Sequence, residues 1–379
     1  MKIQEEYFET GSIGKLKDIL LRNSARKIFL VTGKKSFEES GLKKVTEDLT
    51  SDFQIFRYSD FSENPKAEDV EKGIELFRNS GCDTIVAAGG GSVIDTGKLI
   101  NILSAQSESP ENYITGKSVI SKQGKLFIAI PTTSGAGSEA THFAVVYLDK
   151  EKYSLAHEFI LPDIVITDPE LTFSVPPYVT AVSGIDAFSQ AIESYWCINS
   201  NKESKQFSSE AIKLIFGNIV SAVKSPSEEN RMNMSKAANL SGKAINITKT
   251  TAPHAISYSL TSYFGVPHGQ AVSLTLGEFL KYNYEVTEND INDKRGVSFV
   301  KNTIEEISEL LGCSSVCEAR DKINLLMREI GLKTKLSETG IVSPENINLI
   351  LENVNTERLQ NNPRSLTREN LNSILKKIL

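Results

Sequence analysis

Strands and helices alternate through the first 130 residues of this chain, and this alternation restricts the fold more than any other feature. Short apolar runs rich in β-branched residues predict strands at 27–33, 53–58, 83–90 and 125–131. Helical spacing is found between them, at 34–49, at 66–80 and from Ser92 onwards. Strands separated by helices form a parallel sheet, whose ligands lie at the carboxyl ends of the strands. We therefore expect an open, Rossmann-like α/β sheet.

The spacing of apolar residues changes near residue 174 and stays helical almost to the C-terminus. A chain of 379 residues is also too long for one ordinary hydrophobic core. We predict two domains, an α/β dinucleotide-binding domain over 1–173 and an all-helical metal-binding and substrate domain over 174–379.

The composition excludes several classes of partner. The formal net charge of -6 gives no basic surface for nucleic acid, and no apolar run is long enough to span a membrane. The N-terminus lacks the cationic and apolar regions of a signal peptide. The four cysteines are too few and too scattered for a disulfide scaffold. We expect a cytoplasmic protein that binds neither nucleic acid nor a membrane, and we expect it to be a homodimer.

Two neighbouring strand ends carry glycine-rich turns. Residues 89-GGGS-92 follow a buried strand and open a helix, so that backbone N–H groups and the helix N-terminus face one point. Residues 131-PTTSGAGSEAT-141 form a second such turn after the next strand. Glycines also serve simple tight turns, but two such turns at adjoining strand ends favour a dinucleotide site.

The predicted helical domain contains two of the four histidines in apolar surroundings. A helix through His254, a break at Gly265 and a new helix at His268 would return the second imidazole to the first. Asp186 and Gln190 are four residues apart, so they project from one face of another helix. These four side chains are a candidate site for a divalent metal. The alternatives are that the histidines are hydrogen-bonded core residues and that Asp186 is a helix cap.

At these residues the chain resembles the iron-containing, or group III, alcohol dehydrogenase family, which shares its fold with dehydroquinate synthase. Five segments carry the resemblance in the family's order: 89-GGGSVIDTGK-98, 131-PTTSGAGSE-139, 162-PDIVITDPELT-172, 186-DAFSQAIE-193, and His254 followed fourteen positions later by the His268 of a PHG triplet. The resemblance implies a Rossmann-like domain, a helical domain, a nicotinamide cofactor, NAD(P)H, and a divalent metal, Fe2+ or Zn2+, that polarises the substrate oxygen of an alcohol or aldehyde.

The resemblance also implies roles for individual residues. Asp186, Gln190, His254 and His268 would hold the metal, and His268 and Tyr258 would take part in catalysis, with Tyr258 or bulk water supplying the proton. The cofactor residues would be Gly33, Gly89, Gly90, Gly91, Ser92, Asp95, Thr132, Thr133, Ser138 and Lys152.

Two positions depart from the family pattern. Gln190 stands where a histidine ligand is usual, and Tyr258 stands where many members carry another histidine. An amide oxygen is a harder and weaker ligand than imidazole, so the departure affects which metal binds and how tightly.

Segments 186–196, 253–258 and 362-NPR-364 look like the branch of the family that reduces phosphonoacetaldehyde to 2-hydroxyethylphosphonate. A phosphonate requires a positioned cation, and we expect Arg358 or Arg364 to provide it. The alternative is that Arg364 only caps a helix and that Arg358 is solvated.

The cofactor preference is predicted from one position. Where NAD-preferring members of the family carry an aspartate after the first strand, this chain has Gly33, followed by Lys34 and Lys35. Without a carboxylate to repel a 2′-phosphate, NADPH should be accepted at least as well as NADH.

Three other functions are compatible with parts of this pattern. They are a dehydroquinate synthase or glycerol-phosphate dehydrogenase relative, a generic short-chain alcohol dehydrogenase of the butanol or 1,3-propanediol type, and a non-enzymatic binding protein with a decayed metal site. The helix 186–193 and the spacing of the two histidines favour the alcohol dehydrogenases.

Overall fold

A computed structural model describes residues 3–149 and 151–379, which form two compact units, 1–175 and 176–379. Each unit has its own hydrophobic core. Among the described residues, no helix combines the length and the apolar character needed to cross a membrane.

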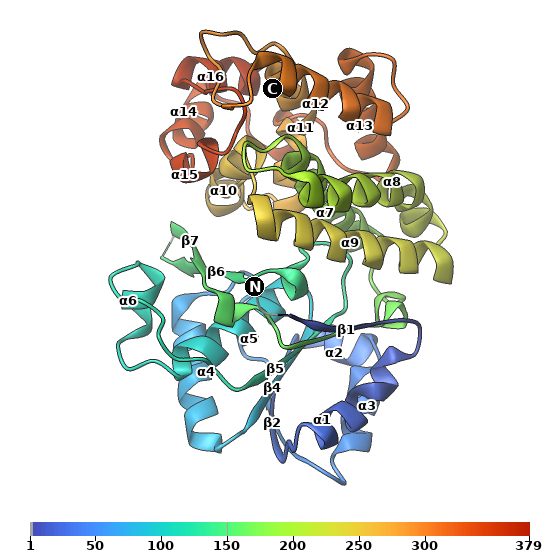
Figure 1. Ribbon diagram of the computed structural model, residues 1–379, viewed down its shortest axis with the longest axis vertical. Coiled ribbons are helices and arrows are strands. Elements are labelled where there is room, and N and C mark those ends of the chain that lie inside the picture. Colours follow the sequence, from blue (N-terminus) through green and yellow to red (C-terminus); the bar gives the residue numbers. More distant parts are fainter. Residues whose placement is uncertain (1–2, 150) are drawn as a thin grey trace. The chain divides into compact units, whose positions relative to one another are not determined.

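The first unit is built on a six-stranded parallel sheet with the order β1-β8-β5-β4-β2-β3 (Figure 1). The strands are β1 (Glu5–Phe8), β2 (Lys27–Thr32), β3 (Gln54–Tyr58), β4 (Thr84–Gly89), β5 (Leu126–Pro131) and β8 (Ile164–Thr167). An antiparallel hairpin of β6 (Phe143–Leu148) and β7 (Glu151–Ala156) lies outside this sheet. The predicted α/β class is confirmed.

Helices cover both faces of the sheet, because successive side chains of a strand point to opposite faces and both sets are apolar here. Residues such as Phe29 and Ile85 pack with α4 (Ala67–Ser80), α5 (Gly91–Ser104) and α6 (Pro110–Ile114). Their neighbours Leu30 and Val86 pack with α1 (Leu16–Arg22), α2 (Lys35–Glu39) and α3 (Leu42–Leu49) on the other face (Figure 1). The carboxyl ends of β2, β4 and β5 therefore meet at one edge of a sheet that is buried on both faces.

Some predicted elements of this unit need correction. The single helix predicted over 34–49 is two helices, because Gly41 adopts a left-handed conformation with φ of 81° and begins α3. Strands β1 and β8 have four residues each and were not predicted, and neither was the β6–β7 hairpin. Short 3-10 turns at Ser12–Lys15, Ser138–Ala140, Glu158–Ile160 and Pro169–Thr172 complete the unit.

The second unit is helical, as predicted. It contains α7 (Pro177–Trp196), α8 (Lys202–Lys224), α9 (Glu228–Thr248), α10 (Ala252–Phe264), α11 (His268–Tyr284), α12 (Val297–Leu310), α13 (Val316–Glu329), α14 (Pro344–Glu352), α15 (Thr356–Leu359) and α16 (Arg368–Lys377), with a 3-10 turn at Ser337–Thr339. Helix α7 is buried on nearly all sides, and α8, α9 and α11 pack around it. A helix surrounded in this way holds its polar side chains in fixed places.

Candidate active site

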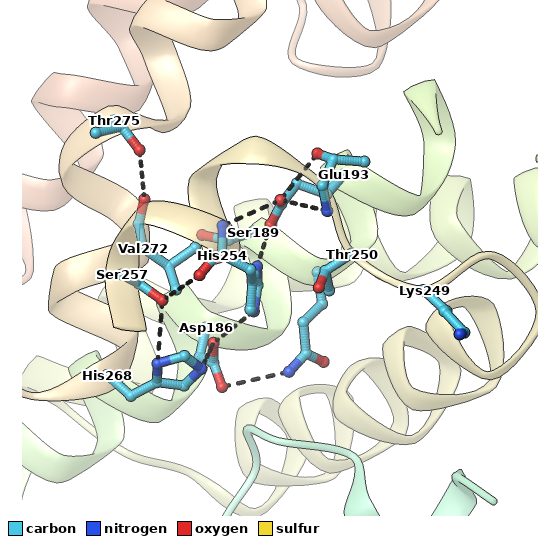
Figure 2. Close-up of polar contacts among 12 residues, drawn as sticks. Asp186, Ser189, Glu193, Lys249, Thr250, His254, Ser257, His268, Val272 and Thr275 are labelled. Atoms are coloured by element: carbon cyan, nitrogen blue, oxygen red, sulfur yellow. Dashed lines mark hydrogen bonds and ion pairs between the residues drawn. The ribbon is translucent and has the colours of Figure 1, made fainter. Parts of the chain in front are cut away.

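Three candidate metal ligands from three helices of the second unit lie together. Asp186 lies on α7, His254 is in the first turn of α10, and His268 is the first residue of α11. Their ligand atoms all lie within 4.8 Å of one another. The Nε2 atoms of His254 and His268 are 3.5 and 3.9 Å from Oδ1 of Asp186 (Figure 2). The two imidazole rings therefore lie next to each other, as predicted, with ring centroids 5.3 Å apart.

Two glycines allow these helices to approach. Gly265 ends α10 in a left-handed conformation with φ of 66°, which reverses the chain before α11. Gly269 lies against α7, where a Cβ atom would collide with the carbonyl oxygen of Val182 and come within 3.0 Å of the Cβ of Asp186. Any larger residue at 269 would therefore push α11 and His268 away from Asp186.

Each histidine ring is also held at its other nitrogen. Nδ1 of His254 contacts the buried carboxylate of Glu193, and Nδ1 of His268 lies 3.4 Å from Oγ of Ser257 (Figure 2). The Ser257 hydroxyl donates to the carbonyl oxygen of His254, so Nδ1–H of His268 donates to Ser257. Both rings thus direct Nε2 toward Asp186, as metal-binding histidines do.

This set of atoms fits a divalent metal. Ligands about 2.1 Å from a tetrahedral Zn2+ lie about 3.4 Å from one another, close to the separations from Asp186 to the two histidines. Two imidazoles and one carboxylate also form the usual ligand set of non-haem Fe2+. The sequence alternative of separate hydrogen-bonded core histidines does not account for this convergence.

The charge around His254 favours a cation. Burial disfavours a charged imidazole, but the carboxylates of Glu193 and Asp186 outweigh burial and raise the pKa of His254 to about 10. A bound dication would supply the positive charge next to the two carboxylates that the imidazolium proton otherwise supplies.

Gln190 lies one helical turn after Asp186 and is also buried. Its Nε2 donates a hydrogen bond of 3.3 Å to Oδ2 of Asp186. Gln190 therefore orients the carboxylate of Asp186, and its role as a fourth ligand stays a prediction. Tyr258 lies one turn after His254 on α10, with its ring centroid 6.3 Å from that of His268. This places the Tyr258 ring beside that of a candidate metal ligand, and its catalytic role stays a prediction.

The two glycine-rich turns of the first unit touch each other at the carboxyl edge of the sheet. A Cβ atom at Gly90 would lie 3.2 Å from Oγ1 of Thr133, and one at Gly91 would lie 2.7 Å from the Cβ of Ala136. Thr132 N–H donates to the carbonyl oxygen of Gly89. The turns thus need glycine for their own packing, and they also bring together the residues predicted to bind the cofactor: Gly89, Gly90, Gly91, Ser92, Thr132, Thr133 and Ser138.

Asp95 and Lys98 lie inside the first unit, behind these turns. The carboxylate of Asp95 accepts a hydrogen bond of 3.0 Å from Val145 N–H. The ammonium group of Lys98 donates to the carbonyl oxygens of Thr141 and Phe143, at 2.8 and 2.9 Å. Both side chains therefore attach the β6–β7 hairpin to α5. Lys152, also predicted to reach the cofactor, is on β7, with its ammonium nitrogen 6.0 Å from the ring centroid of Tyr147.

Gly33 follows β2, and the structure adds Arg57 beside it. Arg57 donates from Nε to Oγ1 of Thr32 and from Nη2 to the carbonyl oxygen of Gly33, and its guanidinium lies 4.0 Å over the ring of Phe37. The neighbouring lysines are engaged elsewhere, Lys34 with Asp60 at 2.8 Å and Lys35 with Glu39 at 3.4 Å. Arg57 was not predicted from the sequence because nothing local links it to Gly33, 24 positions earlier.

The two candidate substrate arginines differ in their surroundings. Arg364 is paired with Asp290 at 2.7 Å, donates to the carbonyl oxygen of Tyr282 and stacks on the Tyr282 ring. These contacts give Arg364 a structural role, and its expected part in substrate binding stays a prediction. Arg358, on α15, is only 7 % exposed. Across residues 3–149 and 151–379, its guanidinium meets no carboxylate or other hydrogen-bonding partner.

Comparison with known proteins agrees with this geometry. Residues 4–169 match the sequence model of the iron-containing alcohol dehydrogenases, and residues 180–379 match the model for the C-terminal part of that family. The choline dehydrogenase of Bacillus subtilis is 31% identical over 362 residues, covering 93% of this chain and 87% of that protein. The phosphonoacetaldehyde reductase of Streptomyces viridochromogenes is 30% identical over 303 residues, covering 77% of this chain and 75% of that protein.

Among solved structures, the sulfoacetaldehyde reductase of Bifidobacterium kashiwanohense in complex with NAD+ superimposes with a TM-score of 0.89. It is 30% identical, and the match covers 100% of this chain and 97% of that one. The chain therefore belongs to the iron-containing alcohol dehydrogenase family and is an NAD(P)-dependent oxidoreductase that acts on the CH–OH group of alcohols and, in reverse, on aldehydes.

Proposed function

We propose that this enzyme reduces phosphonoacetaldehyde to 2-hydroxyethylphosphonate with a nicotinamide cofactor. The observation that carries the proposal is Arg358, a residue only 7 % exposed whose guanidinium has no anionic partner among the described residues. A buried charge is costly unless it is paired, so such an arginine favours an anion from outside the chain. The planar guanidinium suits the oxygens of a phosphonate, which it binds bidentately.

The position of Arg358 relative to the metal ligands supports this assignment. Asn355 caps α15, and its N–H donates to the carbonyl oxygen of Ala255, the residue after His254. Asn361, after α15, donates to the carbonyl oxygen of Thr250 just before α10. The segment that carries Arg358 is therefore attached to the first turn of the helix that carries His254, as a short bifunctional substrate requires.

Relatives of similar identity act, by their names, on substrates of opposite charge. Choline is a cation, whereas phosphonoacetaldehyde and sulfoacetaldehyde are two-carbon aldehydes that carry an acidic group. Overall identity therefore does not select the substrate. The charge of Arg358 favours the acidic aldehydes.

Asp186, His254 and His268 would hold the metal, with Gln190 orienting the carboxylate of Asp186. When bound, a divalent metal stabilises the negative charge that develops on the carbonyl oxygen as hydride arrives from the nicotinamide. Arg358 would fix the acidic end of the substrate, which orients the aldehyde for hydride transfer. Either the Tyr258 hydroxyl or water would supply the proton to the oxygen of the product.

We also infer that NADPH is used at least as well as NADH. Gly33 presents no carboxylate to the adenosine ribose, and Arg57 lies beside it with its guanidinium held over Phe37. A guanidinium at this place would attract a 2′-phosphate.

The substrate proposal is tested with Arg358→Met, which keeps much of the apolar stem but removes the charge. The KM for phosphonoacetaldehyde should rise about tenfold or more, the effect of losing one charge-assisted hydrogen bond, while turnover of propanal should hardly change. Arg368→Met is the matched control, because Arg368 is exposed on α16 and its ion pair with Glu352, at 3.6 Å, is also exposed. Equal losses on both aldehydes would make Arg358 structural, and a wild-type preference for propanal would indicate a generic short-chain alcohol dehydrogenase.

A further inference from the structure

Glu193 is a fully buried carboxylate, seven positions after Asp186 on α7, and its residue type and spacing alone do not predict a separate role for it. It lies at the N-terminus of α10, where the first backbone N–H groups of the helix have no partner within the helix. Its two oxygens have different partners, and one of them contacts the ring of His254.

One oxygen of Glu193 serves the helix. Oε1 accepts hydrogen bonds from Thr251 N–H at 3.0 Å, from the Thr251 hydroxyl at 2.9 Å and from His254 N–H at 3.3 Å. The Thr251 hydroxyl itself accepts from Nε1 of Trp196, so its own proton is directed to Glu193. Three donors thus require an acceptor at this oxygen.

The other oxygen serves the histidine. Oε2 contacts Nδ1 of His254, and a carboxylate at that place accepts Nδ1–H. Nε2 of the same ring faces Oδ1 of Asp186 at 3.5 Å, on the side where His268 also lies (Figure 2). Only a ring protonated at Nδ1 offers a lone pair at Nε2 to a metal.

We propose that Glu193 is a positioning residue that fixes the orientation and the tautomer of His254, and that the affinity of the site for its metal depends on this carboxylate. The inference rests on the proposed role of Asp186, His254 and His268 as metal ligands. It assigns His254 a charged partner at Nδ1, whereas Nδ1 of His268 lies 3.4 Å from the uncharged hydroxyl of Ser257.

Glu193→Gln separates positioning from packing because the side chain keeps its size. The three donors at Oε1 require the amide oxygen there, so the amide NH2 would face Nδ1 of His254 and donate to it. That arrangement puts the ring proton on Nε2 and blocks the metal. We expect the dissociation constant for Zn2+, measured by competition with a chelator, to rise about tenfold or more.

Thr251→Val is the matched control. It removes a hydroxyl donor from the same carboxylate and an acceptor from Trp196, but it leaves the contact of Glu193 with Nδ1 of His254. The free energy of unfolding of the metal-free variant should be lower than that of the metal-free wild type. Its Zn2+ dissociation constant should stay within about threefold of the wild-type value. Equal losses of Zn2+ affinity in the two variants, or none in Glu193→Gln, would overturn the proposal.

A measurement on the wild type tests the proposal even if Glu193→Gln does not fold. With only four histidines in the chain, 15N-histidine spectra of the Zn2+-loaded protein are simple enough to assign. His254 should be ligated through Nε2 and carry its proton on Nδ1, and ligation through Nδ1 would refute the proposed role. Neither readout involves turnover, so a wrong substrate assignment would not affect the result.

Discussion

At the scale of single residues, the proposed use of NADPH depends on Gly33, which carries no carboxylate. A side chain is sterically possible there, because a Cβ atom would meet only the Ser36 side chain, whose hydroxyl can rotate away. Gly33→Asp should therefore fold, and its carboxylate should repel a 2′-phosphate and accept the ribose hydroxyl of NADH. We expect kcat/KM for NADPH to fall about tenfold or more, equivalent to roughly 1.4 kcal/mol, with NADH little affected.

Gly33→Asn is the control for this substitution, since it adds the same bulk without the charge. It should leave the ratio of NADPH to NADH activity close to that of the wild type. If both variants lose activity with the two cofactors alike, Gly33 matters for packing and the inferred use of NADPH loses its support.

Lys98 gives the first unit a pH dependence. Burial lowers the pKa of Lys98 to about 8, although Asp95 and Glu139 oppose this effect. With a pKa of 10.5 when unfolded, the lysine binds more protons in the unfolded state between pH 8 and 10.5, so its contribution to the free energy of unfolding rises with pH across this window.

The variant Lys98→Met isolates this effect because other groups titrate equally in both proteins. The free energy of unfolding of the wild type relative to Lys98→Met should increase between pH 7.5 and 10, by an amount on the order of 1–3 kcal/mol. Urea unfolding at the two pH values measures it. A difference that is unchanged, or that shrinks at pH 10, would show that Lys98 is not held with a lowered pKa.

At the scale of elements, the contact between α7 and α11 sets the geometry of the metal ligands. Gly269→Ala places a methyl group against the backbone carbonyl of Val182, which cannot rotate away. We expect a loss of about 1–3 kcal/mol in stability from this overpacking, together with weaker Zn2+ binding, because His268 would move away from Asp186.

Gly217→Ala tests whether any alanine would have this effect. Gly217 is exposed on α8, with no other atom within 4 Å of an added Cβ, so alanine should leave Zn2+ binding unchanged and stabilise the helix slightly. Calorimetric unfolding and Zn2+ titration of both variants decide the matter. Normal Zn2+ affinity in Gly269→Ala would show that the helices tolerate a wider spacing.

The predictability of these elements follows from the range of the interactions that form them. Long periodic segments such as α4 and β5 were predicted within about two residues, because their patterns are local. Strand β1 was missed because four residues, two of them glutamates, carry no alternation, and its pairing with β8 is visible only in the folded sheet. The break at Gly41 was missed because a glycine inside a helical pattern is often tolerated.

The same distinction applies to the site. Asp186, His254 and His268 were proposed from spacing and family resemblance, and the structure brings them together. Glu193 was not singled out, because its contact with His254 spans 61 positions and depends on how α7 and α10 pack. The sequence also does not distinguish Arg358 from Arg364. The structure does, because Arg364 contacts Asp290 and the carbonyl oxygen of Tyr282.

At the scale of the whole molecule, the two units have separate cores and separate tasks. The sheet edge of the first unit carries the glycine-rich turns that we expect to bind the dinucleotide, and the helical second unit carries the three candidate metal ligands. The helical unit has a large apolar core besides the metal ligands, so removing the metal should abolish turnover but leave that unit folded.

We infer that Asp186, His254 and His268 hold the metal on which aldehyde reduction depends. The most direct test is to strip the protein with a strong chelator, verify its metal content and secondary structure, and measure aldehyde reduction before and after adding Fe2+ or Zn2+. We predict that turnover falls about a hundredfold or more in the stripped, folded protein, because several kcal/mol of charge stabilisation are lost, and that it returns with metal. Full turnover by a folded, metal-free preparation would show that aldehyde reduction needs no metal at this site.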